Sequence, residues 1–576
     1  MSLEAVHLCV DWARNNGAFI DERIDFKLDT ATGLHAISKA PIKDGKELIK
    51  IPEKLLLYRE VAEAHFKVET PAGTNPNALL QLYVAKLKFD SACKDSTFFQ
   101  PYLNTLPTPT SINAPYFWTS NELLALKGTD LLIKTERNLK KLVSEWFAIV
   151  THLNVMDDDD TQFYLQSSST RISDLILRSD NLKWHSFHAY LWATYIFSSR
   201  AFPELLLKRK VEDVNQAFLF PIVDLLNHAN LTKVAWGLAD GSGDATFSTK
   251  ETLKAGDELL NNYGNKSNEE LILGYGFSLP NNDFDTATLT LRLPAGQLQS
   301  FETQGLELED INLAENSVNF TLSMATPLPP QLIHLFGILN QLSSEQVCTT
   351  RSILEGTTQL NKVIDQKIAF YKSASKLKAS LANSERSKLT KTYMTGTKRI
   401  YQECCDSIKR FQKRLLKELK PMSFKSLFKS DTTFANSLTL TFAITKYEDL
   451  LTKGFLQQAL LLFIVRLSNE GPNMQVPKFI QDCFKDVAET IVVDKEDVQE
   501  YLPFYKSLFP QLSSKIPEIY NQGDWGIKSF IIAGTVLDRL MWQSPLSHEV
   551  YFLERMPYSF AKAGPEIHDR IASLRV

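Results

Sequence analysis

The sequence is poor in cysteine. It has six cysteines in 576 residues, and none of them forms a CxxC pair. Cys404 and Cys405 are adjacent, a spacing that suits neither an ordinary disulfide nor a zinc knuckle. This composition argues against a disulfide-stabilised secreted scaffold and favours a reducing compartment. We therefore expect a cytoplasmic protein, with the nucleus as an additional location.

Long hydrophobic runs are also missing. The most apolar stretch, residues 455–465, contains Gln457 and Gln458 and is followed by Arg466. It is about half as long as the ~20 residues that a membrane-spanning helix needs, so we expect a buried helix there. The first residues lack the basic and apolar regions of a signal peptide. We expect no membrane partner.

The chain as a whole has no excess of one charge. Its 63 Lys and Arg residues against 67 Asp and Glu residues give a net charge of −4, so general affinity for nucleic acid is not expected. Residues 361–420 are the exception, with sixteen basic and five acidic residues. Such a segment is either a solvated helical face or a docking surface for an acidic protein face or ribosomal RNA.

Several catalytic motifs are absent. The sequence contains no GxSxG nucleophile elbow, P-loop, HExxH motif or GxGxxG fingerprint. Its ten histidines do not pair at metal-ligand spacing, so we expect no metal site.

Strand-like patterns occur in two separate parts of the sequence. Residues 33–37 and 46–51 are predicted to form a hairpin around a turn at 43–45. Residues 218–290 contain further strands, including an alternating threonine and apolar pattern at 286–293. Neither part alone has enough strands for a stable sheet, so residues 17–58 and 218–290 should come together.

The remaining sequence has mainly helical spacing. A helical insertion is predicted at about 60–197, and nearly all of the chain beyond 295 is predicted to be helical. Long antiparallel helices are expected within 361–420, with a break near Thr395-Gly396. The predicted fold class is α+β: a β-rich domain at 1–294, split by the helical insertion, followed by an all-α domain at 295–576.

Four clusters contain residues that suit chemistry. They are Ser199-Arg200-Ala201-Phe202, Asp224-Leu225-Leu226-Asn227-His228, Asn262-Tyr263-Gly264 and Gly274-Tyr275-Gly276-Phe277. Each one alone has a structural explanation. An Asn-His pair can cap a turn, a Tyr-Gly pair can pack on a core, and an arginine at a helix end is usually exposed.

In this order, the four clusters resemble the SET-domain protein-lysine methyltransferases of the Rubisco large-subunit methyltransferase branch. Residues 196–202 look like the helix-end SRAF motif of that branch, and residues 221–228 look like its D-x-x-N-H motif. Residues 263–277 look like its catalytic tyrosine segment. The resemblance covers roughly 20–290. Within the branch, the amino-acid sequences of these segments are most similar to those of the fungal ribosomal-protein lysine methyltransferases, in particular the member numbered one.

The resemblance implies a fold, a cofactor and a set of site residues. The β-rich part would be a SET domain, and the C-terminal part would be its substrate-binding domain. Tyr263 would be the catalytic tyrosine. The implied residues for binding S-adenosylmethionine are Gly33, Leu34, Ser199, Arg200, Asn227, His228 and Tyr263. The implied residues on the substrate side are Asp224, Tyr275 and Phe277.

Two positions depart from the family pattern. His35 stands where a second glycine is common, and Ala229 stands where serine is common. No cysteine occurs between Cys93 and Cys348, so a zinc segment of the kind that closes histone-type sites is not expected after Phe277. The C-terminal chain would have to close the site instead.

The predicted activity is S-adenosylmethionine-dependent methylation of protein lysine. The amine must be neutral to attack a sulfonium, although free lysine has a pKa of ~10.4. An apolar channel and a nearby positive charge both disfavour the ammonium form. The expected substrate is a ribosomal protein of the large subunit, acted on by a monomer. Three alternatives stay open: a non-ribosomal substrate, a SET-like module that binds lysine segments without turnover, and a helical scaffold.

Overall fold

The computed structural model describes residues 2–29, 33–71, 73–207, 211, 213–239, 241–294, 297, 301, 304–376, 384–470 and 476–560. Contacts within the chain divide it into two units. Unit 1 is Met1–Thr286 with Tyr371–Lys398, and unit 2 is Ala287–Phe370 with Arg399–Val576. Unit 1 therefore contains the N-terminal half of the chain together with the end of one long helix and the beginning of the next.

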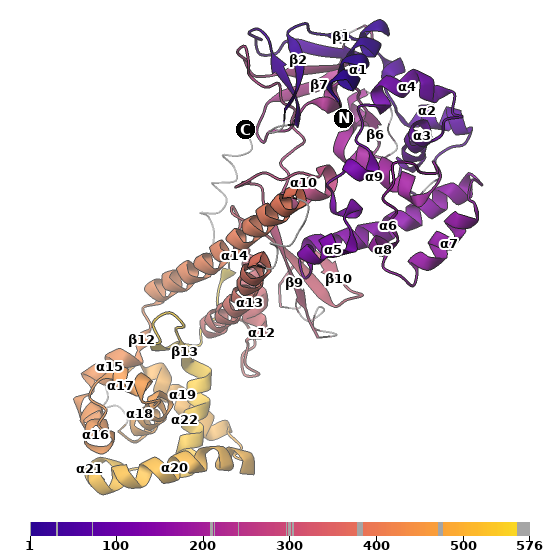
Figure 1. Ribbon diagram of the computed structural model, residues 1–576. Coiled ribbons are helices and arrows are strands. Elements are labelled where there is room, and N and C mark those ends of the chain that lie inside the picture. Colours follow the sequence, from indigo (N-terminus) through magenta and orange to yellow (C-terminus); the bar gives the residue numbers. More distant parts are fainter. Residues whose placement is uncertain are drawn as a thin grey trace. The chain divides into compact units, whose positions relative to one another are not determined.

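Unit 1 combines short strands with a block of helices (Figure 1). Its strands are β1 Phe19–Ile20, β2 Ile24–Asp29, β3 Gly33–Ser38, β4 Glu47–Ile51, β5 Ala201–Pro203, β6 Ala217–Leu219, β7 Val234–Leu238 and β8 Ala245–Thr249. Its helices are α1 Leu3–Asn15, α2 Arg59–Phe66, α3 Ala78–Phe89, α4 Asp95–Leu103, α5 Ser120–Leu123, α6 Asp130–His152, α7 Asp158–Ser167, α8 Ile172–Leu175, α9 Phe187–Arg200 and α10 Asn268–Tyr275.

The largest sheet joins the two strand-rich parts of the sequence, as predicted. Its order is β1-β4-β8-β7, and all neighbours are antiparallel. Ile49 of β4 lies opposite Phe247 of β8, and Phe247 lies opposite Trp236 of β7. Ile49 and Phe247 are fully buried, so this pairing forms part of the core of unit 1.

The predicted hairpin between residues 33–37 and 46–51 is wrong. β3 pairs with β2 along its whole length, from Ile24 opposite Ser38 to Asp29 opposite Gly33. The turn at Gly45 instead directs the chain toward β8, because the Gly45 N–H donates to the Thr249 carbonyl at 2.8 Å. β4 therefore lies between β1 and β8, away from β3.

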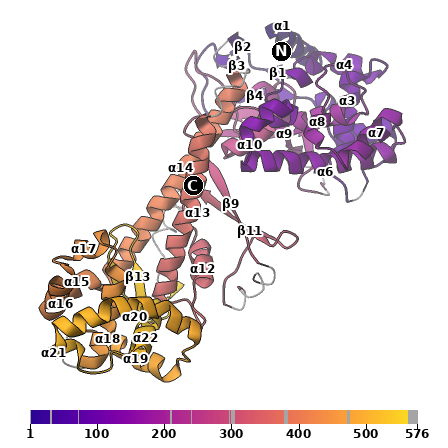
Figure 2. The same cartoon turned by 60° about the horizontal axis from the view of Figure 1, so that its bottom comes forward.

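The helical insertion lies between β4 and β5, as expected. α3 and α9 are apolar on nearly all sides and pack on each other in the core (Figure 2). Within the insertion, α5 continues as a 3₁₀ turn at Leu124–Leu126, and α6 is 23 residues long. The insertion brings α4 and α9 to the strand-rich part, which matters for the site below.

The beginning of α14, Ser384–Leu419, packs within unit 1. The buried Arg386 forms an ion pair with Glu122 at 2.5 Å. The break predicted near Thr395-Gly396 is wrong, because α14 continues through both residues. Glycine is needed there for another reason: a Cβ on Gly396 would overlap the carboxylate of Asp285.

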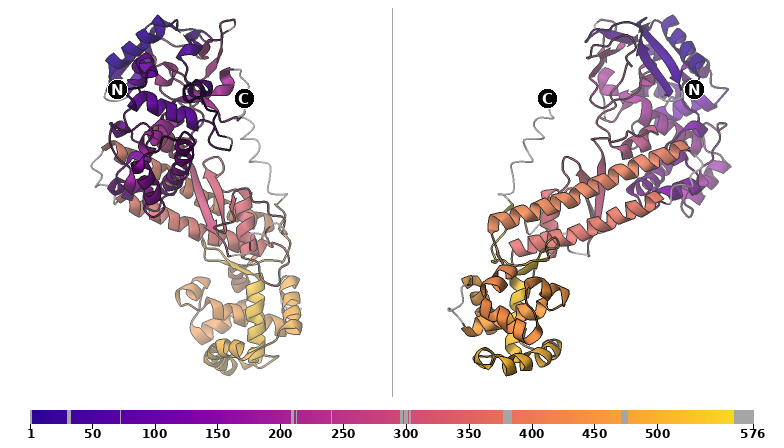
Figure 3. Two further views of the ribbon diagram at one scale, coloured as in Figure 1. Left: turned by 90° about the vertical axis from the view of Figure 1, so that its right-hand side faces the viewer. Right: turned by 60° about the vertical axis from the view of Figure 1, so that its left-hand side comes forward.

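Unit 2 is mainly helical, and its long helices appear in salmon and orange in Figure 3. Its helices are α12 Pro330–Leu339, α13 Thr350–Lys376, α14, α15 Phe424–Ser430, α16 Thr432–Phe442, α17 Tyr447–Thr452, α18 Leu456–Glu470, α19 Lys478–Thr490, α20 Lys495–Lys515, α21 Pro517–Tyr520 and α22 Ile527–Leu540. Its strands are β9 Thr286–Arg292, β10 Ile311–Asn312, β11 Ser317–Ser323, β12 Met422–Ser423, β13 Met541–Gln543 and β14 Val550–Phe552.

The expectation of an all-α second part is therefore too simple. Two three-stranded sheets, β10-β11-β9 and β12-β14-β13, accompany its helices. The predicted strand at 286–293 is β9. The long helices α13 and α14 pack together, because Gln412 donates to the Thr357 and Thr358 hydroxyls at 3.0 and 3.3 Å. The predicted buried helix at 455–465 is α18, in a second core.

All six cysteines are free and buried. Within the described ranges, no helix combines the length and the apolar content needed to cross a bilayer.

Candidate active site

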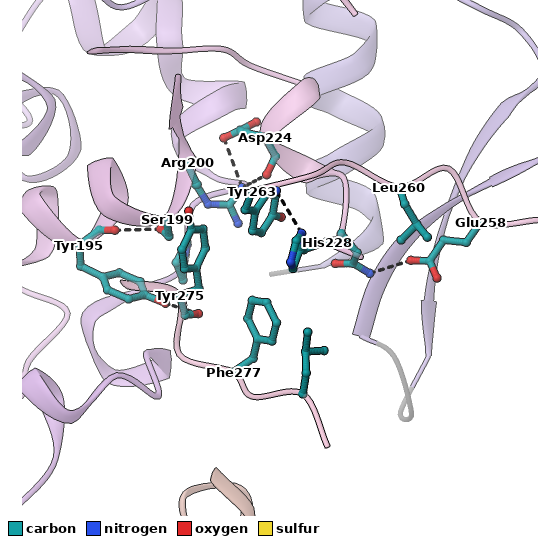
Figure 4. A pocket seen from close by; sticks show the side chains of 13 residues that line it. Tyr195, Ser199, Arg200, Asp224, His228, Glu258, Leu260, Tyr263, Tyr275 and Phe277 are labelled. Carbon is teal, nitrogen blue, oxygen red and sulfur yellow. Dashed lines mark hydrogen bonds and ion pairs between the residues drawn. The ribbon is translucent and has the colours of Figure 1, made fainter. Parts of the chain in front are cut away.

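The first site residues come from the end of α9. Ser186 caps the start of this helix by accepting from the Ala189 N–H at 3.3 Å, and the helix ends at Arg200, as its SRAF motif predicts. Ser199 donates its hydroxyl to the Tyr195 carbonyl one turn back, at 2.8 Å. The chain then turns into β5, so Arg200 lies at a helix-to-strand junction next to the site (Figure 4).

Arg200 pairs with Asp224 inside the protein. Its Nη1 donates to the Asp224 backbone carbonyl at 2.8 Å and lies 3.3 Å from Oδ2 of the same residue. The hydroxyl of Tyr102, from α4, donates to that Oδ2 at 2.9 Å. The Asp224 side chain is 0% exposed and that of Arg200 only 14%. Burial raises the pKa of Asp224, against the opposing effect of the Arg200 charge.

The turn that positions Asp224 is strained. Ile222 has φ +73° and ψ −49°, a conformation that β-branched residues rarely adopt, and it is fully buried. The Asp224 N–H donates to the Phe220 carbonyl at 3.1 Å and holds the turn closed. One Asp224 oxygen, Oδ1, has no hydrogen-bond partner in the described part of the chain.

Asn227 links β3 to the segment after β8. Its amide nitrogen donates to the Leu34 carbonyl and to Oε1 of Glu258, each at 2.9 Å. Its backbone carbonyl accepts from the Asn261 N–H at 2.7 Å. Both amide hydrogens are therefore used by the protein, while no donor among the described residues reaches Oδ1. That oxygen is available to accept a hydrogen bond from a ligand.

His228 supports Tyr263. Its Nδ1 accepts from the Tyr263 N–H at 3.0 Å, so Nε2 must carry the proton that it shares with Oδ1 of Asn230 at 2.9 Å. Burial lowers the pKa of His228, which favours this neutral form. The His228 and Tyr263 rings stack at 4.9 Å and 15°.

Tyr263 lies between two other rings. Its ring also stacks on Tyr275 at 4.8 Å and 11°, as Figure 4 shows. Its hydroxyl donates to the Leu226 carbonyl at 2.6 Å. Burial raises the pKa of Tyr263 above its ordinary value, so the hydroxyl stays protonated near neutral pH. The Tyr263 oxygen can therefore accept a hydrogen bond, but it is not a base.

Tyr275 ends α10, and Gly276 reverses the chain behind it. Gly276 has φ +75°, and a Cβ there would lie 3.0 Å from the Tyr195 hydroxyl. That hydroxyl donates to the Tyr275 carbonyl at 2.8 Å. Burial raises the pKa of Tyr275 to about 12. Phe277 follows, with its ring edge-on to Tyr275 at 6.1 Å.

These residues surround one cavity of about 530 Å³. Its walls are Pro107, Tyr195, Ser199, Arg200, Asp224, Asn227, His228, Glu258, Leu260, Tyr263, Tyr275, Phe277 and Leu279. Eight of the ten residues singled out in the sequence line it. Gly33 and Leu34 do not, although the Leu34 carbonyl contacts Asn227 directly. Gly33 has φ +70° with open space around it, so it is required for the turn and not for lack of room.

Sequence reasoning missed several wall residues. Tyr195 lies four residues before Ser199 on the same helix face, so helical spacing could have pointed to it. Pro107 comes from the helical insertion and carries no local signal, and neither does Tyr102, which is not a wall residue but donates to Asp224. Glu258 follows the Gly256 turn and pairs with Asn227, which only the folded chain reveals.

The cavity suits an organic cofactor with one flat and one polar end. Phe277 and Tyr275 provide aromatic surface, and Oδ1 of Asn227 provides a free acceptor for an ammonium group. S-adenosylmethionine has both features. Among the described residues, the groups of His, Cys, Asp and Glu close enough to hold a metal are His65-Cys93-Asp95 and Asp157-Asp160-His185, and none of these lines the cavity.

The comparisons with known proteins agree with this geometry. A family model described as "SET domain" matches residues 33–264, and one described as "EFM1 middle domain" matches 286–419. Protein-lysine N-methyltransferase EFM1 of Saccharomyces cerevisiae is 40% identical over 96% of this chain and 98% of its own. Ribosomal lysine N-methyltransferase 1 of the same yeast is 29% identical over 76% of this chain and 82% of its own.

Solved structures show the same fold. The SET domain of LSMT bound to methyl-lysine and AdoHcy superimposes with a TM-score of 0.51 at 18% identity, covering 71% of this chain and 93% of that one. Rubisco LSMT bound to AdoMet gives 0.50 at 18% identity, with the same coverage.

Proposed function

Because the chain belongs to the SET-domain family of protein-lysine N-methyltransferases, we propose that its 530 Å³ cavity is where the methyl group is transferred. The predicted activity, S-adenosylmethionine-dependent methylation of protein lysine, is confirmed by this membership. The observation that carries the site proposal is the convergence of Tyr263, Tyr275 and Asn227 on one cavity from distant parts of the chain.

Tyr263 is the proposed catalytic residue. Its hydroxyl hydrogen is committed to the Leu226 carbonyl, which leaves oxygen lone pairs to accept an N–H from the lysine amine. Such an acceptor fixes the direction of the nitrogen lone pair, and orientation is the main requirement of this displacement. Since Tyr263 stays protonated, the lysine proton must leave to solvent before methyl transfer. The buried rings of Tyr263 and Tyr275 favour the neutral amine.

The proposed cofactor residues follow from their positions. S-adenosylmethionine supplies the transferable methyl group on its sulfonium. Oδ1 of Asn227 would accept from the ammonium of its amino-acid end, and Ser199 would lie beside Arg200 near that end. His228 would contact the adenine through its backbone, and Gly33 and Leu34 would border the cofactor from β3.

Arg200 and Asp224 take revised roles. The resemblance implies that Arg200 binds the cofactor and that Asp224 lies on the substrate side. In the structure, Arg200 pairs with Asp224, whose side chain is fully buried. We therefore propose Asp224 as a positioning residue that holds Arg200. Tyr275 and Phe277 stay proposed as the lining of the lysine channel.

The finer expectations also remain proposals. A ribosomal-protein substrate is supported by the names of two relatives, from Saccharomyces cerevisiae and Schizosaccharomyces pombe, each 29% identical. The name of EFM1, at 40% identity, gives no substrate, so a non-ribosomal protein stays an equal candidate. We keep the division into a catalytic part at 1–294 and a substrate-binding part at 295–576, a monomeric state and a cytoplasmic location as proposals. Ion pairing of Arg386 with Glu122 supports closure of the catalytic part by C-terminal chain.

Transfer of tritiated methyl groups to proteins of an extract tests the function. The extract comes from cells that lack this chain, and the purified full-length enzyme is compared with Tyr263→Phe. We expect the variant to be about 100- to 1,000-fold slower, the range for loss of one oriented hydroxyl or amide in an active site. Calorimetry should give a dissociation constant for S-adenosylmethionine within about twofold of wild type.

A matched control is Tyr551→Phe. This tyrosine donates to Glu549 at 2.7 Å but lies outside the cavity, so turnover should not change. Equal turnover of Tyr263→Phe and wild type would remove Tyr263 from the chemistry. Binding of S-adenosylmethionine without any labelled protein would favour a non-catalytic lysine-binding module. Mass spectrometry of the labelled protein then identifies the lysine and its methylation state.

A further inference from the structure

Unit 2 contains a groove of about 470 Å³ that the methyl-transfer site does not use. It lies between the turn after β11, the start of α12, the C-terminal half of α14 and the last described residues. Its walls are Ala325, Thr326, Pro327, Leu328, Pro330, Ile333, Ser407, Arg410, Phe411, Arg414, Tyr558 and Phe560. Eight of these twelve residues are aliphatic, proline or aromatic, so the groove is mostly apolar.

The apolar walls are held in place by packing. The Tyr558 N–H donates to the Cys348 carbonyl at 2.8 Å. The Tyr558 ring packs edge-on against Phe560 at 4.8 Å, and Phe560 stacks on His334 at 4.1 Å. Phe411 is buried beneath Tyr558 at 6.5 Å. A groove with walls fixed in this way loses little conformational entropy when a partner binds.

Two arginines stand at the rim. The side chains of Arg410 and Arg414 are 62% and 54% exposed. Arg410 contacts Glu403 at 2.5 Å, and Arg414 lies 3.9 Å from Glu418, at the limit of an ion pair. Exposed pairs of this kind contribute little, so both guanidinium groups can exchange these partners for carboxylates of another chain.

The surrounding helix surface is also basic. Residues 399–420 contain seven Lys and Arg against three Asp and Glu, an excess of four. The basic segment seen in the sequence is therefore not uniform: Arg386 is buried in unit 1, whereas the cations beside the groove are largely exposed. The groove therefore opens beside exposed cations.

We propose that this groove docks an acidic segment of the protein that is methylated, with one apolar side chain between two carboxylates. The proposal rests on the proposed function for its partner and on the groove for its chemistry. Arg410 and Arg414 take the carboxylates, and Pro327, Leu328 and Pro330 cover the apolar side chain. Arginine and aromatic residues are enriched among the residues that contribute most of the binding energy at protein–protein interfaces.

RNA fits the groove less well. Binding of single strands uses open aromatic faces on which bases stack. Here Phe411 is buried, and the Tyr558 and Phe560 rings meet at 76°, so each covers part of the other. The two prolines offer surface without hydrogen-bond donors for bases.

Fluorescence anisotropy with a defined peptide tests the proposal on the full chain. The probe is fluorescein-Glu-Asp-Glu-Phe-Glu-Asp-Glu-amide. Its two controls replace phenylalanine by glycine or all acidic residues by glutamine and asparagine. We expect saturable binding of the probe and at least tenfold weaker binding of either control. The double variant Arg410→Ala with Arg414→Ala should bind the probe at least tenfold more weakly.

The matched control is Lys413→Ala with Lys417→Ala, which removes two exposed cations of the same helix outside the groove. It should change affinity less than threefold. Equal losses of affinity in both double variants would mean that the peptide is attracted by the overall positive charge of the helix, and would overturn the proposed docking in the groove. No saturable binding up to 1 mM would also overturn it, as would tighter binding of oligouridine with the same arginine dependence.

Two further measurements separate this proposal from others. If light scattering shows a dimer that Arg410→Ala with Arg414→Ala dissociates, the groove is an interface between two copies and the proposal fails. Labelling of extract proteins by the arginine variant should fall at least fivefold, while binding of S-adenosylmethionine stays unchanged. Failure of wild type to label any protein would instead contradict the proposed function, whatever the peptide result.

Discussion

Replacing Asn227 by alanine should weaken binding of S-adenosylmethionine by removing a contact to its amino-acid end only. The amide nitrogen already donates to the Leu34 carbonyl and to Glu258, so only Oδ1 is left for the ligand. A hydrogen bond from an ammonium group to this oxygen is worth about 1.5–3 kcal/mol. Its loss corresponds to a dissociation constant for S-adenosylmethionine that is about 10- to 160-fold higher. Calorimetry at fixed pH measures this directly.

The same variant should leave a truncated ligand almost unaffected. 5′-Methylthioadenosine has the adenosine part but no amino-acid end, so it cannot use Oδ1 of Asn227. Its affinity should change less than threefold. An equal loss for both ligands would refute the reasoning, because Asn227 would then act by shaping the cavity between β3 and Glu258.

Stability needs its own control, since Asn227→Ala also removes two internal hydrogen bonds. Their loss should lower the free energy of unfolding by about 1–3 kcal/mol. The cost is limited because Glu258 is only half-buried, so water can hydrate its carboxylate when the amide is removed. Asn77→Ala removes two similar bonds, to the Asn215 carbonyl and from the Ala217 N–H, each at 2.9 Å, and none of these residues lines the cavity. It should lose comparable stability and bind S-adenosylmethionine normally.

Three further predictions concern the cavity and the residues that support it. Tyr102→Phe removes a donor from the buried Asp224 carboxylate and should cost about 1–3 kcal/mol in urea unfolding, with a lower kcat at unchanged affinity for S-adenosylmethionine; unaltered stability and turnover would contradict the positioning role. Gly276→Ala forces φ +75° on a residue whose Cβ would lie 3.0 Å from the Tyr195 hydroxyl. The free energy of unfolding should fall by about 1–2 kcal/mol, and turnover should slow. A stabilised, fully active variant would show that this turn adapts. The pH profile of kcat/KM should rise tenfold per pH unit toward pH 9, since the lysine ammonium loses its proton while burial keeps Tyr263 protonated; a profile that falls between pH 8 and 9 in a stable enzyme would assign a titration to the tyrosine.

Much of the site could be predicted because its motifs are local. Asn227 and His228 follow an apolar run, and Tyr263 and Tyr275 each precede a glycine that turns the chain. The pairing of β4 with β8 could also be inferred, since neither strand-rich part suffices for a sheet alone. What the motifs could not give is the partner of each side chain. Tyr102 reaches Asp224 across 122 residues, and this contact exists only after α4 packs in the core.

The two errors of strand and helix pattern have the same physical origin. The turn at Gly45 predicts a change of direction but not which strand pairs with the chain that follows. Ile24, Phe26 and Leu28 alternate with polar residues and mark β2, the true partner of β3. Gly396 favours a helix break, but glycine inside a helix can equally mark a close contact, here with Asp285.

Two unfavourable features of unit 1 occur together at a wall of the cavity, and the pair argues for function more strongly than either one alone. A buried ion pair such as Arg200–Asp224 adds little to stability, because removing both charges from water costs about as much as their attraction returns. Two residues before Asp224, Ile222 holds a strained backbone conformation in the core. A chain under selection for stability alone would replace all three residues with unstrained apolar ones. Arg200 and Asp224 line the same cavity as Tyr263, where an oriented guanidinium and a sharp turn are needed to fix the walls, so the strain is best explained as the cost of a preorganised site.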